Sequence, residues 1–335
     1  MLLREKYMPL AFDDSNFHED TVAQLKNIAS IDTFHNLVLY GPGGSGKYTM
    51  AMMVLQQIYG IDIYNKSLTK FKFNINGNEK EIDIFNSIYH YEIYLSDNNS
   101  YDKLIIIELL KKLCESRHVM SNGFSVVVIK NAHYLTYEIF NALKNINEKY
   151  YDNCKFILLA NTLTNIPKSQ FGFFFFVRMP MVSAEVLVNH FRVLCKNEQI
   201  KITTSQIKTI VAKNERNLNR IYIEMDLMLQ NGEYYSYTTE VEKKCDHIIE
   251  LINTKDIANI TSIRKELYNL TSINIDKGEF IDYIFNYYIT KLPDKNKFIS
   301  LSNEISLKIN KSYRELIHLE YYLIAIMAIL ASDTS

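Results

Sequence analysis

Paired cysteines are missing from this chain of 335 residues, and neither sign of charge dominates it. The cysteines lie far apart and form no C-x-x-C pair, which argues against a zinc site and against a disulfide framework. They are Cys114, Cys154, Cys195 and Cys245. We therefore expect a reducing, intracellular compartment. The formal net charge is −1, so the overall charge does not point to nucleic acid, although a local basic stripe is compatible with it.

Long hydrophobic runs are missing as well. The most apolar stretch, 323–330, is too short to span a bilayer, and residues 1–10 carry charges too early for a secretory signal. We therefore expect no membrane partner. With 47% hydrophobic and 22% charged residues the composition is that of a globular protein, and the length suggests two or three domains.

Short apolar runs alternate with amphipathic stretches over the first 180 residues. Buried strands are predicted at 36–40, 125–129, 155–161 and 173–180, the last with four phenylalanines in a row, Phe173 to Phe176. Helices are predicted at 20–30, 48–60, 103–116 and 137–150. Asn76-Gly77, within 72–84, predicts a β-hairpin. Buried strands that alternate with helices are typical of a mostly parallel, doubly wound sheet.

Helical patterns alone follow Pro180, apart from a polar and aromatic stretch, 231–240, that we interpret as a linker. The last predicted helix carries apolar residues at intervals of three or four, more than a small terminal bundle would need for itself. They include Leu316, Leu319, Leu323 and Ile326. We therefore expect this C-terminal part to drive assembly with other proteins.

The stretch LVLYGPGGSGKYTM, residues 37–50, has the spacing of a phosphate-binding loop, G-x-x-x-x-G-K-[ST], between a strand pattern and a helix pattern. In such a loop, backbone N–H groups and a helix N-terminus cradle the phosphates, and Lys47 would reach the β and γ phosphates. The predicted nucleotide-binding residues of the loop are Gly41, Pro42, Gly43, Gly44, Ser45, Gly46, Lys47, Tyr48 and Thr49.

The partners of an active phosphate loop are absent from the expected positions. Tyr48 stands where Ser or Thr would hold magnesium, and the hydroxyl of Thr49 is turned about 100° around the helix. The strand at 125–129 should end in acids that order the metal and activate water, but Lys130 and Asn131 follow it. Lys130 would repel magnesium, yet its charge could partly replace that of the metal near a phosphate. His133 is either a general base or a surface histidine.

Several blocks together resemble a known family. They are EKYMPLAFDD (5–14), FHEDTVAQLKN (17–27) with the loop that follows at 37–49, YHYEIYLSDNNSYDK (89–103), NALKNINEKY (141–150), Asn161 in LLANT, and IHLEYYLIAIMA (317–328). The sequence is similar to the small subunits of replication factor C, the eukaryotic sliding-clamp loader of the AAA+ class. Among them it is most similar to the subunit at the end of the ring, which has the least typical ATP site.

This resemblance implies three domains: an AAA+ nucleotide-binding domain at 1–180, a helical lid at 181–235 and an all-α collar at 241–335. It implies a hetero-pentamer with other clamp-loader subunits, a sliding clamp as partner, and primer–template DNA inside the ring. The nucleus is the expected location, or a cytoplasmic replication site for a viral version.

The resemblance also extends the site. Tyr7, Pro9 and Asn161, at the sensor position, join the residues expected to bind ATP or ADP, and Lys103 aligns with a basic position near DNA. DNA would be held through its phosphates, because a loader must accept any sequence.

Two catalytic arginines that the resemblance implies are missing. The position of the lid arginine is taken by Asn219, with Arg220 one step away, and the arginine finger would fall near 172–174. No Arg occurs between 155 and 177, where Lys168 is the available cation. We therefore expect this chain to have no catalytic residue and no metal site. The sequence offers no ligand that would hold a magnesium ion beside the nucleotide.

Three hypotheses stay open at this point. The first is a clamp-loader subunit that keeps a nucleotide pocket but does not hydrolyse. The second is an active ATPase subunit with unusual ligands, such as Thr49 and His133. The third is a separate phosphate-loop enzyme, for instance a nucleotide kinase, against which the missing acids and the helical C-terminal third both argue.

Overall fold

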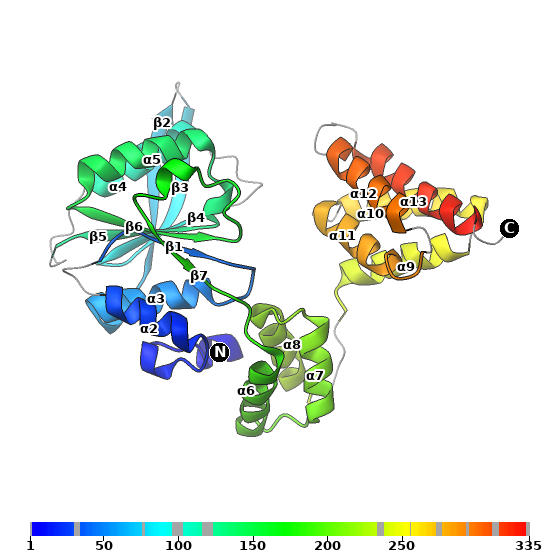
Figure 1. Ribbon diagram of the computed structural model, residues 1–335, viewed down its shortest axis with the longest axis horizontal. Helices are drawn as coiled ribbons and strands as arrows, with labels where there is room; N and C mark the ends of the chain where they lie inside the picture. Colours follow the sequence, from blue (N-terminus) through cyan, green and yellow to red (C-terminus); the bar gives the residue numbers. More distant parts are fainter. Residues whose placement is uncertain are drawn as a thin grey trace. The chain divides into compact units, whose positions relative to one another are not determined.

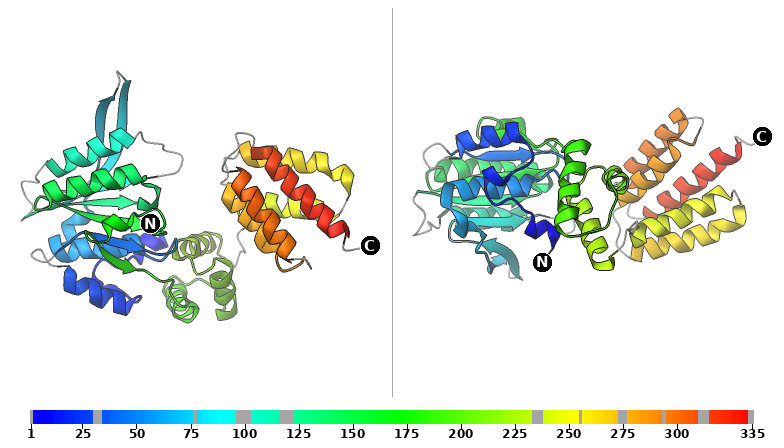
Figure 2. Two further views of the ribbon diagram at one scale, coloured as in Figure 1. Left: turned by 45° about the horizontal axis from the view of Figure 1, so that its top comes forward. Right: turned by 90° about the horizontal axis from the view of Figure 1, so that it is seen from below.

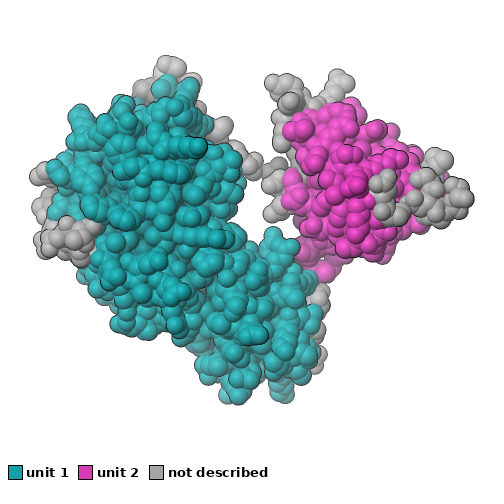
Figure 3. All heavy atoms as spheres, viewed as in Figure 1, with its two compact units in different colours: residues 1–235 teal, residues 236–335 magenta. Residues whose placement is uncertain are grey.

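The chain forms two compact units, residues 1–235 and 236–335, which Figure 3 colours separately. The computed structural model describes residues 2–29, 34–75, 78–95, 103–115, 123–232, 238–254, 256–272, 277–292, 295–309 and 315–332. Within these ranges no helix has the length and apolarity needed to cross a bilayer.

A seven-stranded sheet, in the order β2-β3-β4-β5-β6-β1-β7, forms the centre of the first unit. The strands are β1 Leu37–Tyr40, β2 Ser67–Ile75, β3 Asn78–Asn86, β4 His90–Tyr94, β5 Ser125–Lys130, β6 Cys154–Ala160 and β7 Phe175–Arg178. All pairings from β4 to β7 are parallel, whereas β2 and β3 form an antiparallel hairpin at one edge. The fold class predicted from sequence, a mostly parallel sheet followed by an all-helical part, is confirmed; residues 76–77 of the predicted turn lie outside the described ranges.

Helices cover both faces of this sheet, which is why its central strands β1, β5 and β6 are mostly apolar. Helices α2 (Glu19–Ile28) and α3 (Lys47–Tyr59) pack on the face that carries Leu37, Leu39 and Val128. Helices α4 (Lys103–Glu115) and α5 (Tyr137–Tyr150) pack on the opposite face (Figure 1). The alternation of side chains along each strand therefore divides the core into two layers.

The expectation that Phe173 to Phe176 form a buried strand is partly wrong. The strand begins only at Phe175, whose side chain is 50% exposed, while Phe174 is buried. The reason is position: β7 is an edge strand that pairs with β1 alone, so one flank of this phenylalanine run has no neighbouring strand to cover it.

Three helices follow the sheet within the first unit and share a core of their own. They are α6 (Ala184–Asn197), α7 (Thr204–Lys213) and α8 (Leu218–Asn231). Side chains of Ser183, Thr203 and Asn217 cap their N-termini, as expected for these residue types. The short N-terminal helix α1 (Leu3–Lys6) inserts Leu3 into the same core, so both ends of this unit meet there (Figures 1 and 2).

The second unit is a helical bundle with a separate core (Figure 2). Its helices are α9 (Glu240–Asn253), α10 (Ile260–Ser272), α11 (Lys277–Tyr288), α12 (Lys295–Ile309) and α13 (Glu315–Ser332). The short 3-10 helices among the described residues are η1 Phe12–Asp14, η2 Ile61–Tyr64, η3 Ala132–Tyr134, η4 Lys168–Gln170 and η5 Ile257–Asn259.

The reason we gave for assembly through the last helix is wrong. Leu319, Leu323 and Ile326 are buried in the bundle's own core, and Leu316 packs partly against it. These side chains recur every three or four residues because they face the other helices of the same unit. That residues 241–335 drive assembly stays a prediction. If they do, side chains other than these four have to form most of the contact with partner proteins.

Candidate nucleotide-binding site

The phosphate-loop residues connect the end of β1 to the start of α3, and glycine is required at two of them. A Cβ atom added to Gly41 would lie 2.0 Å from the carbonyl oxygen of Met179. Gly44 has a φ of +75°, and a Cβ atom there would lie 2.0 Å from Oδ1 of Asn217. The spacing that identified the loop therefore reflects close approach of backbone and side chains.

The start of α8, the last of the three helices after the sheet, contacts this loop directly. The N–H of Leu218, the first residue of α8, donates to the carbonyl oxygen of Gly44 over 3.2 Å. Asn217 caps the same helix by accepting from the N–H groups of Asn219 and Arg220 at 3.1 and 3.4 Å. Asn219, which the family resemblance puts at the lid-arginine position, thus lies in the first turn of the helix that touches the loop.

Lys47 lies along its own loop. Its Nζ donates to the carbonyl oxygens of Gly41 and Pro42 over 2.6 and 2.7 Å, and burial lowers its pKa to about 8. Ser45 is buried, and its Oγ has no hydrogen-bond partner among the described residues. An anion in the loop would provide a better partner for the Lys47 ammonium than neutral carbonyls do. The loop is therefore suited to a phosphate.

His18 joins the loop from the start of α2. Its Nε2 lies 3.1 Å from the carbonyl oxygen of Ser45, and burial lowers the pKa of the imidazole. A neutral ring can donate to that carbonyl through a protonated Nε2. The contact links the N-terminal segment to the loop, a link that we did not predict from the sequence.

A cluster of charged side chains surrounds Tyr48, and we call it the Glu92 cluster: Tyr48, Lys66, His90, Glu92 and Lys130. Tyr48 Oη donates to both carboxylate oxygens of Glu92, at 3.0 and 3.2 Å. Lys66 donates to the same carboxylate and, over 2.6 Å, to Tyr48 Oη. Lys130 Nζ is 2.7 Å from Glu92 Oε2 and 3.9 Å from the centroid of the Tyr48 ring. His90 Nε2 is 3.1 Å from Glu92 Oε1.

Glu92 is 3% exposed, yet it is ionised. Burial alone would raise its pKa, but the hydrogen bond from His90 and the attraction of Lys130 and Lys66 outweigh burial and hold the pKa far below its usual value. Burial raises the pKa of Tyr48, with Glu92 adding to the effect, so the phenol is neutral. Burial also lowers the pKa of His90 despite the nearby carboxylate, so this ring is neutral at pH 7.

Asn161 and His133 lie at the same edge of the sheet as the loop. Asn161 directly follows β6, whose last residue, Ala160, accepts a hydrogen bond from Gly41 N–H over 3.1 Å. The backbone N–H of Asn161 donates to His133 Nδ1 over 3.3 Å. Thr49 is half-buried in the first turn of α3. The structure therefore brings the predicted sensor residue beside the loop.

The remaining residues that the sequence predicted for nucleotide or DNA binding contact residues outside the phosphate loop. Tyr7 Oη donates to Glu198 Oε1 over 2.5 Å, just after α6, and packs partly against the core of the three helices; Pro9 is half-buried in the segment that follows. Lys103 Nζ forms an ion pair of 2.6 Å with Glu138 Oε2, which joins the start of α4 to α5. Residues 96–102 of the block 89–103, which resembles the family, lie outside the described ranges.

Sequence reasoning missed Glu92, Lys66 and Asn217. A signal for Glu92 existed, because a glutamate within the apolar strand pattern YHYEIY has to be paired if it is buried. Its partners could not be named, since Lys66 and Lys130 come from segments far apart in the chain.

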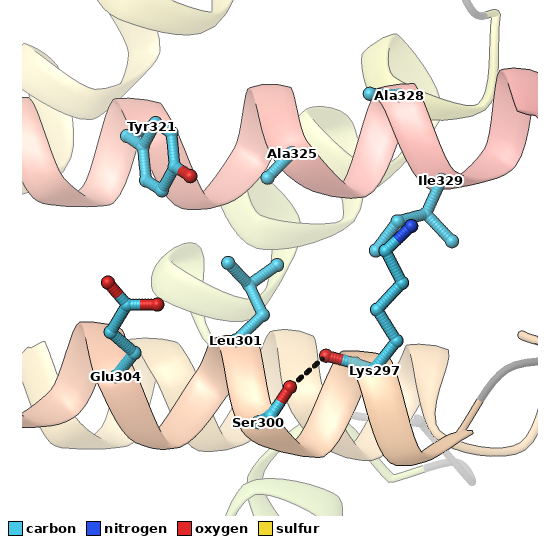
Figure 4. Close-up of a pocket in the computed structure, with 8 residues that line it drawn as sticks. All are labelled: Lys297, Ser300, Leu301, Glu304, Tyr321, Ala325, Ala328 and Ile329. Carbon is cyan, nitrogen blue, oxygen red and sulfur yellow. Dashed lines mark hydrogen bonds between the residues drawn. The ribbon is translucent and has the colours of Figure 1, made fainter.

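A separate hollow of about 400 Å³ lies between α12 and α13 of the second unit (Figure 4). Its lining residues are Lys297, Ser300, Leu301, Glu304, Tyr321, Ala325, Ala328 and Ile329. Its carboxylate, Glu304, is exposed and paired with Lys308 at 2.5 Å. The hollow therefore lacks the buried charge that marks the loop site.

Known proteins similar in sequence to this chain include replication factor C small subunits. A protein of Acanthamoeba polyphaga mimivirus named as a replication factor C small subunit is 27% identical over 341 residues, covering 98% of this chain and 90% of its own length. Replication factor C subunit 5 of Saccharomyces cerevisiae is 24% identical over 97% of this chain and 98% of its own. The chain is thus similar over nearly its whole length to replication factor C small subunits.

Human replication factor C subunit 3 is another such relative, 27% identical over 71% of this chain and 67% of its own length. No family model matches the chain. Among solved structures, RuvB of Thermotoga maritima is 13% identical and covers 84% of this chain and 80% of its own, with a TM-score of 0.47. This structural similarity is too low to support any conclusion about the chain. The sequence similarity to replication factor C small subunits, in contrast, extends through both units.

Proposed function

We propose that this chain is a small subunit of a DNA sliding-clamp loader of the replication factor C type, and that it acts during DNA replication. The observation that carries the proposal is the match to replication factor C small subunits over 97–98% of the chain. A match of that extent includes the phosphate loop, the three helices that follow the sheet and the C-terminal bundle. Such full-length similarity favours a shared role over reuse of the loop alone.

The nucleotide part of the proposal is that ATP or ADP binds at the phosphate loop and is not hydrolysed there. Lys47, the unpartnered hydroxyl of Ser45 and the N-terminus of α3 support binding of phosphate. Lys130 and Asn131 at the end of β5 support the absence of turnover, because neither can order a metal or activate water as an acid does. Nucleotide then serves to hold the loop and the helices of residues 181–235 together.

The assembly part follows from the same relatives, which are named as subunits. We propose a hetero-pentamer in which residues 241–335 join the ring, and in which the sliding clamp and primer–template DNA contact residues 1–180, with Lys103 near DNA. A nuclear location fits the eukaryotic relatives, and a cytoplasmic replication site fits the mimivirus relative.

An active ATPase with Thr49 and His133 is the alternative. His133 uses Nδ1 to accept from the backbone of Asn161, a contact that suits a structural role better than a catalytic one. Steady-state ATPase measurement on the isolated chain separates the two: we expect no turnover above background.

Co-expression with the other subunits of a clamp loader tests the assembly part. We expect the full chain to co-purify in stoichiometric amount, and a chain that ends at residue 235 to fold without associating. The truncation is suited to this test because the core of the second unit contains only residues beyond 240. Failure of the full chain to associate, or equal association of the truncated chain, would contradict the proposal.

A further inference from the structure

The two positions that hold magnesium in a phosphate-loop ATPase are filled by other groups in this chain. In such enzymes the residue after the loop lysine supplies a hydroxyl, and a second strand of the same sheet ends in an acid. Here these positions are Tyr48 and Lys130, and the Lys130 ammonium lies 3.9 Å from the centroid of the Tyr48 ring. A ring and an ammonium group cannot coordinate a hard dication, which requires oxygen ligands. The residues at this place do not fit magnesium.

The nearby carboxylate is not available to a metal either. Glu92 receives hydrogen bonds or ion pairs from Tyr48, Lys66, Lys130 and His90, and it is almost fully buried. These four partners occupy both of its oxygens. Within the part of the chain that the structure describes, no three metal-ligating side chains gather anywhere.

The Glu92 cluster carries a net positive charge. Two ammonium groups, those of Lys66 and Lys130, face one carboxylate, while the ring of His90 is neutral. Both lysine side chains are less than a quarter exposed, so solvent and salt screen them little. Tyr48 directly follows Lys47, which places this charge next to the loop where a phosphate would bind.

We propose that the site takes ATP or ADP without a divalent cation, and that Lys130, paired with Glu92, supplies the counter-charge that magnesium provides elsewhere. The inference rests on nucleotide binding at the loop, which is part of the proposed function. Lys130 is then a specificity-determining residue: it selects the metal-free nucleotide and excludes the dication by repulsion.

Calorimetric titration of the full chain with ADP and with ATP, in EDTA and in excess magnesium, tests this inference. We expect the dissociation constant of each nucleotide in the wild-type chain to be larger in excess magnesium than in EDTA, and more so for ATP than for ADP, because the nucleotide has to release its magnesium ion before it binds. Lys130→Gln should weaken binding about tenfold or more in both buffers, and Lys130→Arg should restore most of the affinity because it keeps the charge. Lys144→Gln is the matched control, since Lys144 also pairs with a glutamate, Glu148, and lies over an aromatic ring, Phe173, but far from the loop in sequence.

Two outcomes would overturn the inference. One is wild-type binding that tightens about tenfold or more with magnesium; the other is unchanged affinity in a folded Lys130→Gln. Should that variant not fold, electron paramagnetic resonance of Mn²⁺ with the wild-type chain and ADP decides instead: a signal beyond that of Mn²⁺ with ADP alone means a bound metal and refutes the inference. Absence of nucleotide binding in either buffer refutes it as well, while co-purification with clamp-loader subunits would leave the proposed assembly role intact.

Discussion

At the scale of single residues, burial of Glu92 explains most of the unusual chemistry of the site. A buried carboxylate is tolerated because four donors compensate for its lost hydration. Removing the carboxylate charge would leave Lys66 and Lys130 close together without their shared partner. The cost of such a change exceeds that of losing a surface ion pair by several-fold.

We predict that Glu92→Gln lowers the free energy of unfolding by about 3–5 kcal/mol at pH 7. Because the pKa of Glu92 is depressed in the folded state, its charge stabilises the fold above the unfolded-state pKa of about 4.3. That stabilisation is lost as the pH falls towards the folded-state pKa, so the difference between variant and wild type should shrink below about pH 4.3.

Urea unfolding at pH 7 and at several acidic pH values measures this difference. Glu148→Gln on the exposed side of α5 is the control, and we expect it to change stability by less than about 0.5 kcal/mol. A difference that stays constant with pH would show that lost packing, and not lost charge, destabilises Glu92→Gln.

At the scale of elements, the contact between the phosphate loop and the start of α8 couples the sheet to the helices that follow it. Leu218 donates to the loop backbone, and Asn217 lies against Gly44. The preceding turn contains two residues in the left-handed region, Glu215 and Arg216, with φ of 50° and 64°. Such backbone is unfavourable for these residue types, so the surrounding contacts have to maintain it.

We predict that Gly44→Ala destabilises the chain by about 2–3 kcal/mol and that Gly43→Ala has a much smaller effect. A Cβ atom at Gly44 meets Asn217 Oδ1 at 2.0 Å on a backbone with positive φ, whereas a Cβ atom at Gly43 meets Asn217 Nδ2 at 4.0 Å, an ordinary contact. Thermal unfolding of the two variants gives the comparison. Adding Asn217→Ala to Gly44→Ala should recover only the part that overlap causes. Equal stability of the two alanine variants would contradict the predicted contact.

At the scale of the whole molecule, each unit has its own hydrophobic core, and we propose a different role for each. The first unit holds the loop and every residue proposed to bind nucleotide, while the second is a helical bundle. Apolar side chains that are exposed on α13 in the described structure include Ile317 and Tyr321, not the residues that the sequence pattern suggested. Any joining of subunits through this bundle has to use such exposed positions.

We predict that Lys168→Ala leaves the ATPase of an assembled clamp loader unchanged within about twofold. The resemblance places a finger for the neighbouring site near 172–174, where this chain has no arginine, and Lys168 is exposed at the start of η4. Related fingers are worth roughly 10³–10⁵ in rate. Steady-state ATPase of the complex is the measurement, and a loss of about tenfold or more at the neighbouring site would identify Lys168 as a substitute finger.

Local patterns in the sequence were enough to predict the main elements and the loop. The loop is recognised from the spacing of Gly41, Gly46 and Lys47, and strand β5 from the apolar run 125–129. Both signals depend only on residues that are close together in the sequence. The helices at 48–60 and 137–150 correspond to α3 and α5 within a residue at each end, because caps and periodicity are local properties.

Tertiary structure alone decided which side chains share a site and which are covered. Glu92, Lys66 and Lys130 meet because β4 pairs with β5 and because the segment before β2 returns to Tyr48 in the first turn of α3. No short window of sequence contains that information. The exposure of Phe175 depends on β7 being an edge strand, and the burial of Leu323 depends on the helices packed around α13. The hydrophobicity of a residue predicts that its side chain will be buried. Which side chains bury it, or which charge pairs with it, depends on contacts between residues that are far apart in the sequence.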